Sequence, residues 1–239
     1  MTSNNSGNGF FSSIPPVTKN IIIINFIAWI ATFAFRRVGI DLVDLLGLHY
    51  FQAESFRFYQ LISYMFLHST ASFSHIFFNM FAVYMFGRVI EVTWGPKRYL
   101  IYYMVTGIGA GLMQELVWFF SLQELIGSGI PMITDGQTTI AVSQYLNLFI
   151  TIGASGAVFG VLLAFGMLFP NTPLFIIFIP IPIKAKYFVI LYGLVELFMG
   201  VSNFGGDNVA HFAHLGGMIF GFILIQYWKI KNKKSGYPY

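Results

Sequence analysis

G-A-S-G-A-V-F-G, residues 153 to 160, places a single serine, Ser155, among glycines at the start of an apolar run. The run ends at Phe169, before Pro170 and Asn171. About 17 residues at ~1.5 Å each cover only ~26 Å of a hydrocarbon core that is ~30 Å thick, so one end of this helix lies recessed. If that end carries Ser155, irregular backbone there is tolerated only beside a water-filled cavity. The segment therefore predicts a buried serine nucleophile with access to water.

The composition is that of a polytopic membrane protein. Of the 239 residues, 56% are hydrophobic and only 9% are charged, which excludes an ordinary soluble domain of this length. The absence of cysteine excludes disulfides, thiolate metal sites and a cysteine nucleophile. Basic and aromatic residues are not interleaved in a patch, so the lipid bilayer is an expected partner and nucleic acid is not.

Hydrophobic runs predict an all-α fold with six membrane-spanning helices. The predicted spans are Val17–Phe35, His75–Ile90, Tyr99–Phe120, Gly153–Phe169, Lys186–Ser202 and Val209–Trp228. The apolar stretch Pro173–Ile183 contains three prolines and is too short to span, so it is predicted to be an interfacial loop. The chain then divides into a disordered tail over residues 1–16, a six-span domain over residues 17–229 and a basic tail over residues 230–239.

The distribution of lysine and arginine predicts the orientation. With six spans both termini lie on one side, and ten of the thirteen basic residues fall on that side. Because cytoplasmic loops carry the excess of positive charge, both termini are predicted to be cytoplasmic, in a multi-pass protein of a bacterial cytoplasmic membrane. All five histidines and Ser155 then fall in the outer half or its loops. A transporter would instead distribute ionisable groups along a path near the midplane.

A serine nucleophile needs a base, and His214 is the best-placed histidine. Small residues let two helices approach closely, which brings a short serine and an imidazole within ~3 Å. The glycines expected to serve this packing are Gly153, Gly156 and Gly160 around Ser155, and Gly217 and Gly221 after His214. His211, almost one turn from His214, is predicted to be a structural or rim residue.

Acyl transfer also needs hydrogen-bond donors where charge develops on the carbonyl oxygen. His75 and Asn79 are spaced i, i+4 on one helix face, and the backbone N–H of Ser155 at a helix start supplies a third donor. The alternative is that His75 and Asn79 only link helices by hydrogen bonds. Because no carboxylate is expected beside the imidazole, the sequence predicts a Ser155/His214 dyad that uses no metal and no cofactor.

Other polar residues have less specific predictions. Glu91 is expected to cap a helix or anchor a loop, and His49 is expected in an exposed loop. Glu115 and Glu196 lie inside spans, where a charge is costly, so each needs a polar partner that the sequence does not identify. The outer loop over residues 36–74 is predicted to form short amphipathic helices, and the loop over residues 121–152 a lid or spacer.

These residues resemble the rhomboid intramembrane serine proteases. G-A-S-G at residues 153–156 resembles the nucleophile motif, His214-L-G-G the base motif and His75-x-x-x-Asn79 the oxyanion pair, while F-G-R-V-I-E ending at Glu91 is a further match. The resemblance implies a six-helix core and cleavage of single-pass transmembrane proteins near their outer ends, without a cofactor. Two departures are Tyr59-Gln60, where the family often has a Trp-Arg pair, and Phe159, where some members have a tyrosine.

The leading interpretation is therefore an intramembrane serine endopeptidase with transmembrane protein substrates. The alternative is a proteolytically inactive relative that binds or escorts membrane proteins. The presence of both Ser155 and His214 argues against that alternative. The oligomeric state and the natural substrate stay open.

Overall fold

The computed structural model describes residues 13–134, 136, 138–176, 179–202 and 210–235. Within these residues the fold is an all-α bundle of six long helical segments. They are α1 (Pro16–Arg36), the continuous segment α4 (Phe73–Ala82), η3 (Val83–Gly87) and α5 (Arg88–Trp94), then α6 (Pro96–Gly127), α8 (Ser155–Leu168), α9 (Ala185–Ser202) and α10 (His211–Ser235). Four of them, α1, α4–α5, α6 and α9, are long and apolar enough to cross a membrane, whereas α8 has only 14 residues.

Several predicted boundaries change. The last helix continues to Ser235, so most of the predicted C-terminal tail over residues 230–239 is helical. The predicted interfacial loop over Pro173–Ile183 forms an antiparallel hairpin of β5 (Pro173–Ile176) and β6 (Ile179–Lys184). Most of the predicted disordered tail, residues 1–12, lies outside the described residues, as do the predicted start of the last span at Val209 and residues 236–239.

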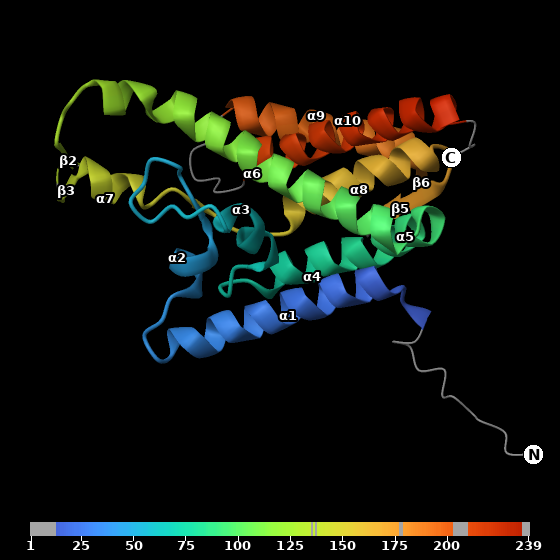
Figure 1. Cartoon of the computed structure of the whole chain (residues 1–239), viewed down its shortest axis with the longest axis horizontal. Coiled ribbons are helices and arrows are strands. Elements are labelled where there is room, and N and C mark those ends of the chain that lie inside the picture. Colours follow the sequence, from blue (N-terminus) through green and yellow to red (C-terminus); the bar gives the residue numbers. More distant parts are fainter. Residues whose placement is uncertain (1–12, 135, 137, 177–178, 203–209, 236–239) are drawn as a thin grey trace, which may run out of the picture.

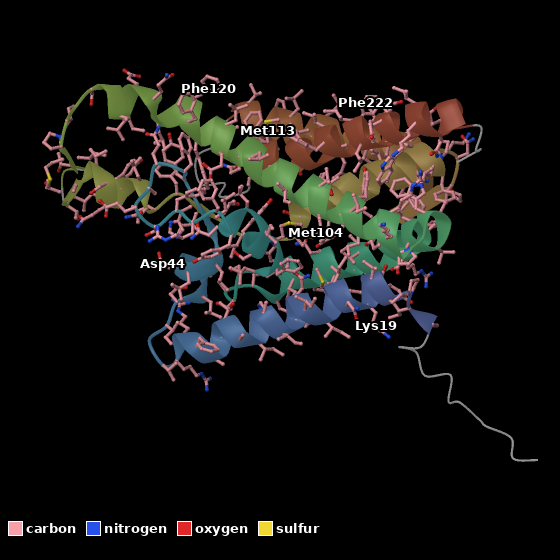
Figure 2. The ribbon with its side chains drawn as sticks, viewed as in Figure 1. Lys19, Asp44, Met104, Met113, Phe120 and Phe222 are labelled. Atoms are coloured by element: carbon pink, nitrogen blue, oxygen red, sulfur yellow. The ribbon has the colours of Figure 1, made fainter. Side chains whose placement is uncertain are left out.

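The two ends of the bundle differ in what they carry. The start of α1, the end of α10 and the β5–β6 hairpin lie at one end, and α2 (Leu42–Leu46) and α7 (Val142–Leu146) lie at the other (Figure 1). Lys19 lies at the first end and Asp44 at the second (Figure 2). The first and the last helix thus have their outer bounds, Pro16 and Ser235, at the same end of the bundle. Between the ends, large apolar side chains of α1 and α9, such as Ile27 and Phe198, are exposed, as expected for a surface that faces lipid.

The loop over residues 36–74, predicted to form short amphipathic helices, contains two short helices together with a strand and a 3-10 turn. After α2 come β1 (Leu48–His49), α3 (Gln60–Ser63) and the 3-10 turn η2 (Tyr64–Phe66). Gln60 holds this loop together: its Oε1 accepts the backbone N–H groups of His49 and Arg57, and its Nε2 donates to carbonyl oxygens of the same loop. An uncharged amide thus anchors the loop at the position where the family often has an arginine. His49, predicted to be exposed, is instead fully buried.

The predicted loop over residues 121–152 begins later, because α6 continues past Phe120 to Gly127, and the segment that follows leads the chain to Ser155. It contains the hairpin of β2 (Met132–Thr134) and β3 (Thr139–Ala141), then α7 and β4 (Ile150–Thr151). β4 pairs antiparallel with β1, with Leu48 opposite Thr151 and His49 opposite Ile150. Because β1 belongs to the first loop, this pairing fixes the position of the backbone immediately before the serine segment.

Candidate active site

Ser155 is positioned by a turn that only glycine forms easily. Gly153 has a φ of +132°, a conformation that L-residues with a side chain rarely adopt, and its N–H donates to the carbonyl oxygen of Tyr64 at 2.9 Å. α8 begins directly afterwards, at Ser155. The backbone N–H groups at this helix start have no partner within the helix and carry the positive end of its dipole. The half-buried Ser155 hydroxyl therefore lies where negative charge is stabilised.

His214 contacts Ser155 in the structure. The His214 Nε2 and Ser155 Oγ atoms lie 2.8 Å apart, although the residues come from α10 and α8. Close backbone packing makes this possible, because a Cβ added to Gly217 would overlap the Gly156 carbonyl. The ring of Phe159 stacks on the His214 imidazole with centroids 4.3 Å apart and planes 7° from parallel. Phe159 thus limits the orientation of the imidazole, although its ring has no hydroxyl group.

Glu196 is the residue that the sequence analysis did not place. Its Oε2 lies 2.8 Å from His214 Nδ1 and 2.7 Å from His211 Nδ1. The expectation that no carboxylate lies beside the imidazole is therefore wrong, and the dyad has a third polar neighbour. A signal existed, because an ionisable residue inside a span is a candidate for function. The pairing itself was not visible, since it depends on how α9 and α10 face each other.

His75 carries a donor hydrogen on Nε2, next to Gly153. Its Nδ1 accepts the backbone N–H of Ser69 at 3.3 Å, which leaves the proton of the neutral imidazole on Nε2. That Nε2 lies 3.1 Å from the position of a Cβ built on Gly153, and Ser155 Oγ lies 3.7 Å from the same position. His75 Nε2 and Ser155 Oγ therefore both lie near the same point at Gly153, at most about 7 Å apart.

Asn79 lies one turn further along the same helix and is buried. Its Nδ2 donates to the carbonyl oxygen of His75 at 2.8 Å, which engages one of the two amide hydrogens. The second hydrogen is chemically able to serve an oxyanion. The structure thus brings the predicted donor pair to one helix face, with Asn79 bonded to its own helix.

The five glycines predicted to pack near the site have different neighbours. Gly153 forms the turn, and Gly217 of α10 packs against the backbone of Gly156 in α8. Gly156, Gly160 and Gly221 face α6, where an added Cβ would first meet Ala110, Thr106 and the Tyr102 hydroxyl, respectively. The Tyr102 hydroxyl also donates to the Gly160 carbonyl at 2.8 Å. The long helix α6 therefore completes a three-helix packing unit that the sequence analysis described as a pair.

Glu91 and Glu115, the other buried acidic residues in the described part of the chain, have structural partners. Glu91 accepts hydrogen bonds from the backbone N–H groups of Val17 and Thr18 and from the Thr18 hydroxyl, as predicted for a helix cap. Glu115 accepts the backbone N–H of Phe51 at 2.9 Å and so anchors the first loop.

Two groups of imidazoles lie near the serine. His68 is buried beside His75, with ring centroids 4.9 Å apart, and burial followed by this neighbour lowers the pKa of His68 to about 3. Separately, Glu196, His211 and His214 each offer one donor atom, and the three donor atoms lie within 4.8 Å of one another. This second group has the residue types of a metal-ligand set.

The fold and the site together define a polytopic helical membrane protein with a serine–histidine pair at the start of a short helix. The family model of the Rhomboid domain matches residues 55–229, and the chain belongs to the rhomboid family.

Named relatives come from three kinds of organism. Rhomboid-like protein 11, chloroplastic, of Arabidopsis thaliana is 28% identical over 86% of this chain, and the alignment covers 62% of that protein. Rhomboid protease AarA of Providencia stuartii is 27% identical over 71% of this chain and 56% of its own length. Rhomboid protein 1, mitochondrial, of Saccharomyces cerevisiae is 27% identical over 64% of this chain and 37% of its own length. The chain thus spans about a third to three fifths of these relatives.

Proposed function

We propose that this protein is an intramembrane serine endopeptidase that cleaves single-pass transmembrane proteins near the outer membrane interface. The observation that carries the proposal is the 2.8 Å contact between Ser155 Oγ and His214 Nε2. Membership of a family that includes a protein named as a protease supports it. No cofactor is required, because the nucleophile, the base and the donors all come from the chain.

The tautomer of His214 follows from its two contacts. Glu196 accepts the Nδ1 hydrogen, so Nε2 carries the lone pair that accepts the Ser155 proton as Oγ attacks the substrate carbonyl. His214 then gives that proton to the leaving amine, and an acyl-enzyme remains on Oγ. Water attacks the acyl group and loses a proton to Nε2, which then protonates Oγ as the acyl–oxygen bond breaks and the product acid leaves. In this scheme Glu196 orients the imidazole and stabilises its cationic form, which makes it a positioning residue.

The developing oxyanion is assigned to His75 Nε2, the free hydrogen of Asn79 and the backbone N–H of Ser155. The assignment is supported by the tautomer that Ser69 imposes on His75 and by the position of Ser155 at a helix start. We further propose that both termini lie in the cytoplasm of a bacterial cell, because Lys/Arg residues concentrate at that end of the bundle.

The test is chemical labelling combined with proteolysis. Purified protein in detergent is treated with a serine-directed fluorophosphonate and, separately, with a labelled single-span peptide. Wild type is expected to be labelled and to cleave, whereas Ser155→Ala and His214→Ala are expected to do neither at a measurable rate, because serine without its base is an ordinary alcohol. A folded wild type that binds the peptide without labelling or cleavage would favour a non-catalytic binding protein.

A further inference from the structure

We propose that Glu196, His211 and His214 form a binding site for a zinc-class divalent metal ion, and that an ion bound there switches the protease off. The metal-binding part stands independently, whereas the inhibition part rests on the proposed function. Nothing in the proposed reaction uses His211, yet its Nδ1 lies 2.7 Å from the same Glu196 oxygen that His214 contacts. Two imidazole nitrogens of α10 thus flank one carboxylate oxygen of α9, and the three donor atoms lie within 4.8 Å of one another.

The donor geometry suits a small transition-metal ion. Zn²⁺ binds imidazole nitrogen and carboxylate oxygen at ~2.0–2.2 Å in a tetrahedron, which separates neighbouring donor atoms by about 3.3 Å. The two nitrogen–oxygen separations of 2.7 and 2.8 Å are slightly shorter, so small side-chain rotations open the site. Two histidines and one carboxylate leave one position for water. Imidazole ligands select Zn²⁺ or Co²⁺ over Mg²⁺ and Ca²⁺, which take oxygen ligands.

None of the three ligand side chains is completely enclosed by the described residues. The side chains of His211, Glu196 and His214 keep 12%, 11% and 10% of their surface exposed, respectively. His211 and His214 are three residues apart on α10, which places them on neighbouring parts of one helix face.

Metal binding at His214 Nδ1 reverses the tautomer that catalysis needs. In the metal-free arrangement Glu196 accepts the Nδ1 hydrogen and leaves Nε2 free to accept the serine proton. An ion on Nδ1 occupies that nitrogen's lone pair, so the single proton of the neutral imidazole resides on Nε2. Nε2–H then donates to Ser155 Oγ and cannot accept its proton. The same ion also takes the Glu196 oxygen that stabilises the imidazolium.

Binding is tested directly with Co²⁺, whose visible absorption reports nitrogen and oxygen coordination. Metal-stripped wild type and Ser155→Ala are both expected to bind one Co²⁺ per chain, displaced by Zn²⁺ and not by Mg²⁺. His211→Gln keeps a hydrogen-bond donor toward Glu196 and lacks the imidazole, so its affinity is expected to fall at least tenfold. Thermal unfolding without metal verifies that each variant is folded. Wild type without stoichiometric Co²⁺ binding, or His211→Gln with unchanged affinity, would overturn the site.

Inhibition is tested by fluorophosphonate labelling with and without saturating Zn²⁺, compared within each variant. Zn²⁺ is expected to slow labelling of wild type at least tenfold and to leave His211→Gln labelling at its own metal-free rate. Equal inhibition of both proteins would show that Zn²⁺ acts elsewhere. If Ser155→Ala binds Co²⁺ as expected while metal-free wild type is never labelled, the metal site stands and the proposed protease function fails.

Discussion

Glu91 and Glu196 are both buried carboxylates in the helix bundle, with 2% and 8% of their surface exposed, yet they have different kinds of partner. Glu91 accepts two backbone N–H groups and a hydroxyl at the start of α1, near the end that holds the termini. Glu196 accepts from two imidazoles, one of which contacts the serine. The first carboxylate caps a helix, and the second faces groups that change their protonation during the proposed reaction.

Burial of a carboxylate in a membrane protein therefore does not by itself indicate catalysis. Backbone N–H groups keep their protons, so a carboxylate that binds them contributes to the stability of the fold. An imidazole gains and loses a proton, so a carboxylate that binds it affects the reactivity of that imidazole. The identity of the hydrogen-bond partners distinguishes the two glutamates, and substitutions at both positions test whether the distinction holds.

The largest expected difference is between Glu196→Gln and Glu91→Gln. Glu196→Gln is expected to slow fluorophosphonate labelling of Ser155 by roughly 10²–10⁴-fold, because an amide neither favours the required tautomer nor stabilises the imidazolium. Glu91→Gln is expected to lower thermal stability, since one of its oxygens becomes a donor facing the N–H groups of α1, and to keep the labelling rate of the folded fraction within a few fold.

Two measurements in the same detergent separate these effects: the labelling rate and the midpoint of thermal unfolding. The comparison fails if Glu91→Gln reduces labelling of folded protein as strongly as Glu196→Gln does. It also fails if Ser155 in Glu196→Gln is labelled at the wild-type rate. That result would mean that the site works as the Ser155/His214 dyad predicted from sequence.

A second substitution tests Asn79, which is proposed to donate a hydrogen bond to the oxyanion, whereas Glu196 accepts hydrogen bonds. Asn79→Ala is expected to lower turnover of a single-span peptide by roughly 10²-fold, the usual loss for one oxyanion donor. Because the Asn79 side chain bonds only its own helix among the residues that the structure describes, the unfolding midpoint is expected to change little. Parallel losses of activity and stability would instead support the alternative that Asn79 is a structural link.

The parts of the site that were predictable depend on local sequence. Ser155 follows a glycine turn and His214 precedes Gly217, so the close approach of α8 and α10 follows from residue size alone. Glu91 was predictable as a cap because it lies at the end of its span. Glu196 was not assigned, since its partners lie 15 and 18 residues away on another helix and depend on the rotation of α9. The contacts of Gly160 and Gly221 with α6 likewise depend on the packing of a third helix.

The helix contact that brings His214 to Ser155 predicts a smaller, packing effect. Gly217→Ala places a Cβ against the Gly156 carbonyl and is expected to destabilise the protein by ~1–3 kcal/mol and to reduce labelling, because the imidazole moves away from Ser155. Gly127→Ala is the matched control, since an added Cβ there meets nothing within 4 Å. Thermal unfolding of the two variants should differ by several degrees, and equal midpoints would contradict the close contact of α8 and α10.

The smallest expected effect concerns His68, a buried imidazole beside His75. Like Glu91, His68 is expected to affect stability and not reactivity. Burial and the neighbouring His75 lower the pKa of His68 to about 3, below the value near 6.5 of an exposed histidine. The unfolded state therefore binds the proton more readily, so the stability from His68 is present above pH 6.5 and is lost as the pH falls toward 3. Between pH 7.5 and 5.5 this loss amounts to about 1 kcal/mol.

The substitution His68→Phe keeps a ring and removes the titration. The stability of this variant, measured by thermal unfolding, should therefore fall less than that of wild type over this pH range. Identical pH dependence in the two proteins would mean that His68 is hydrated and titrates normally.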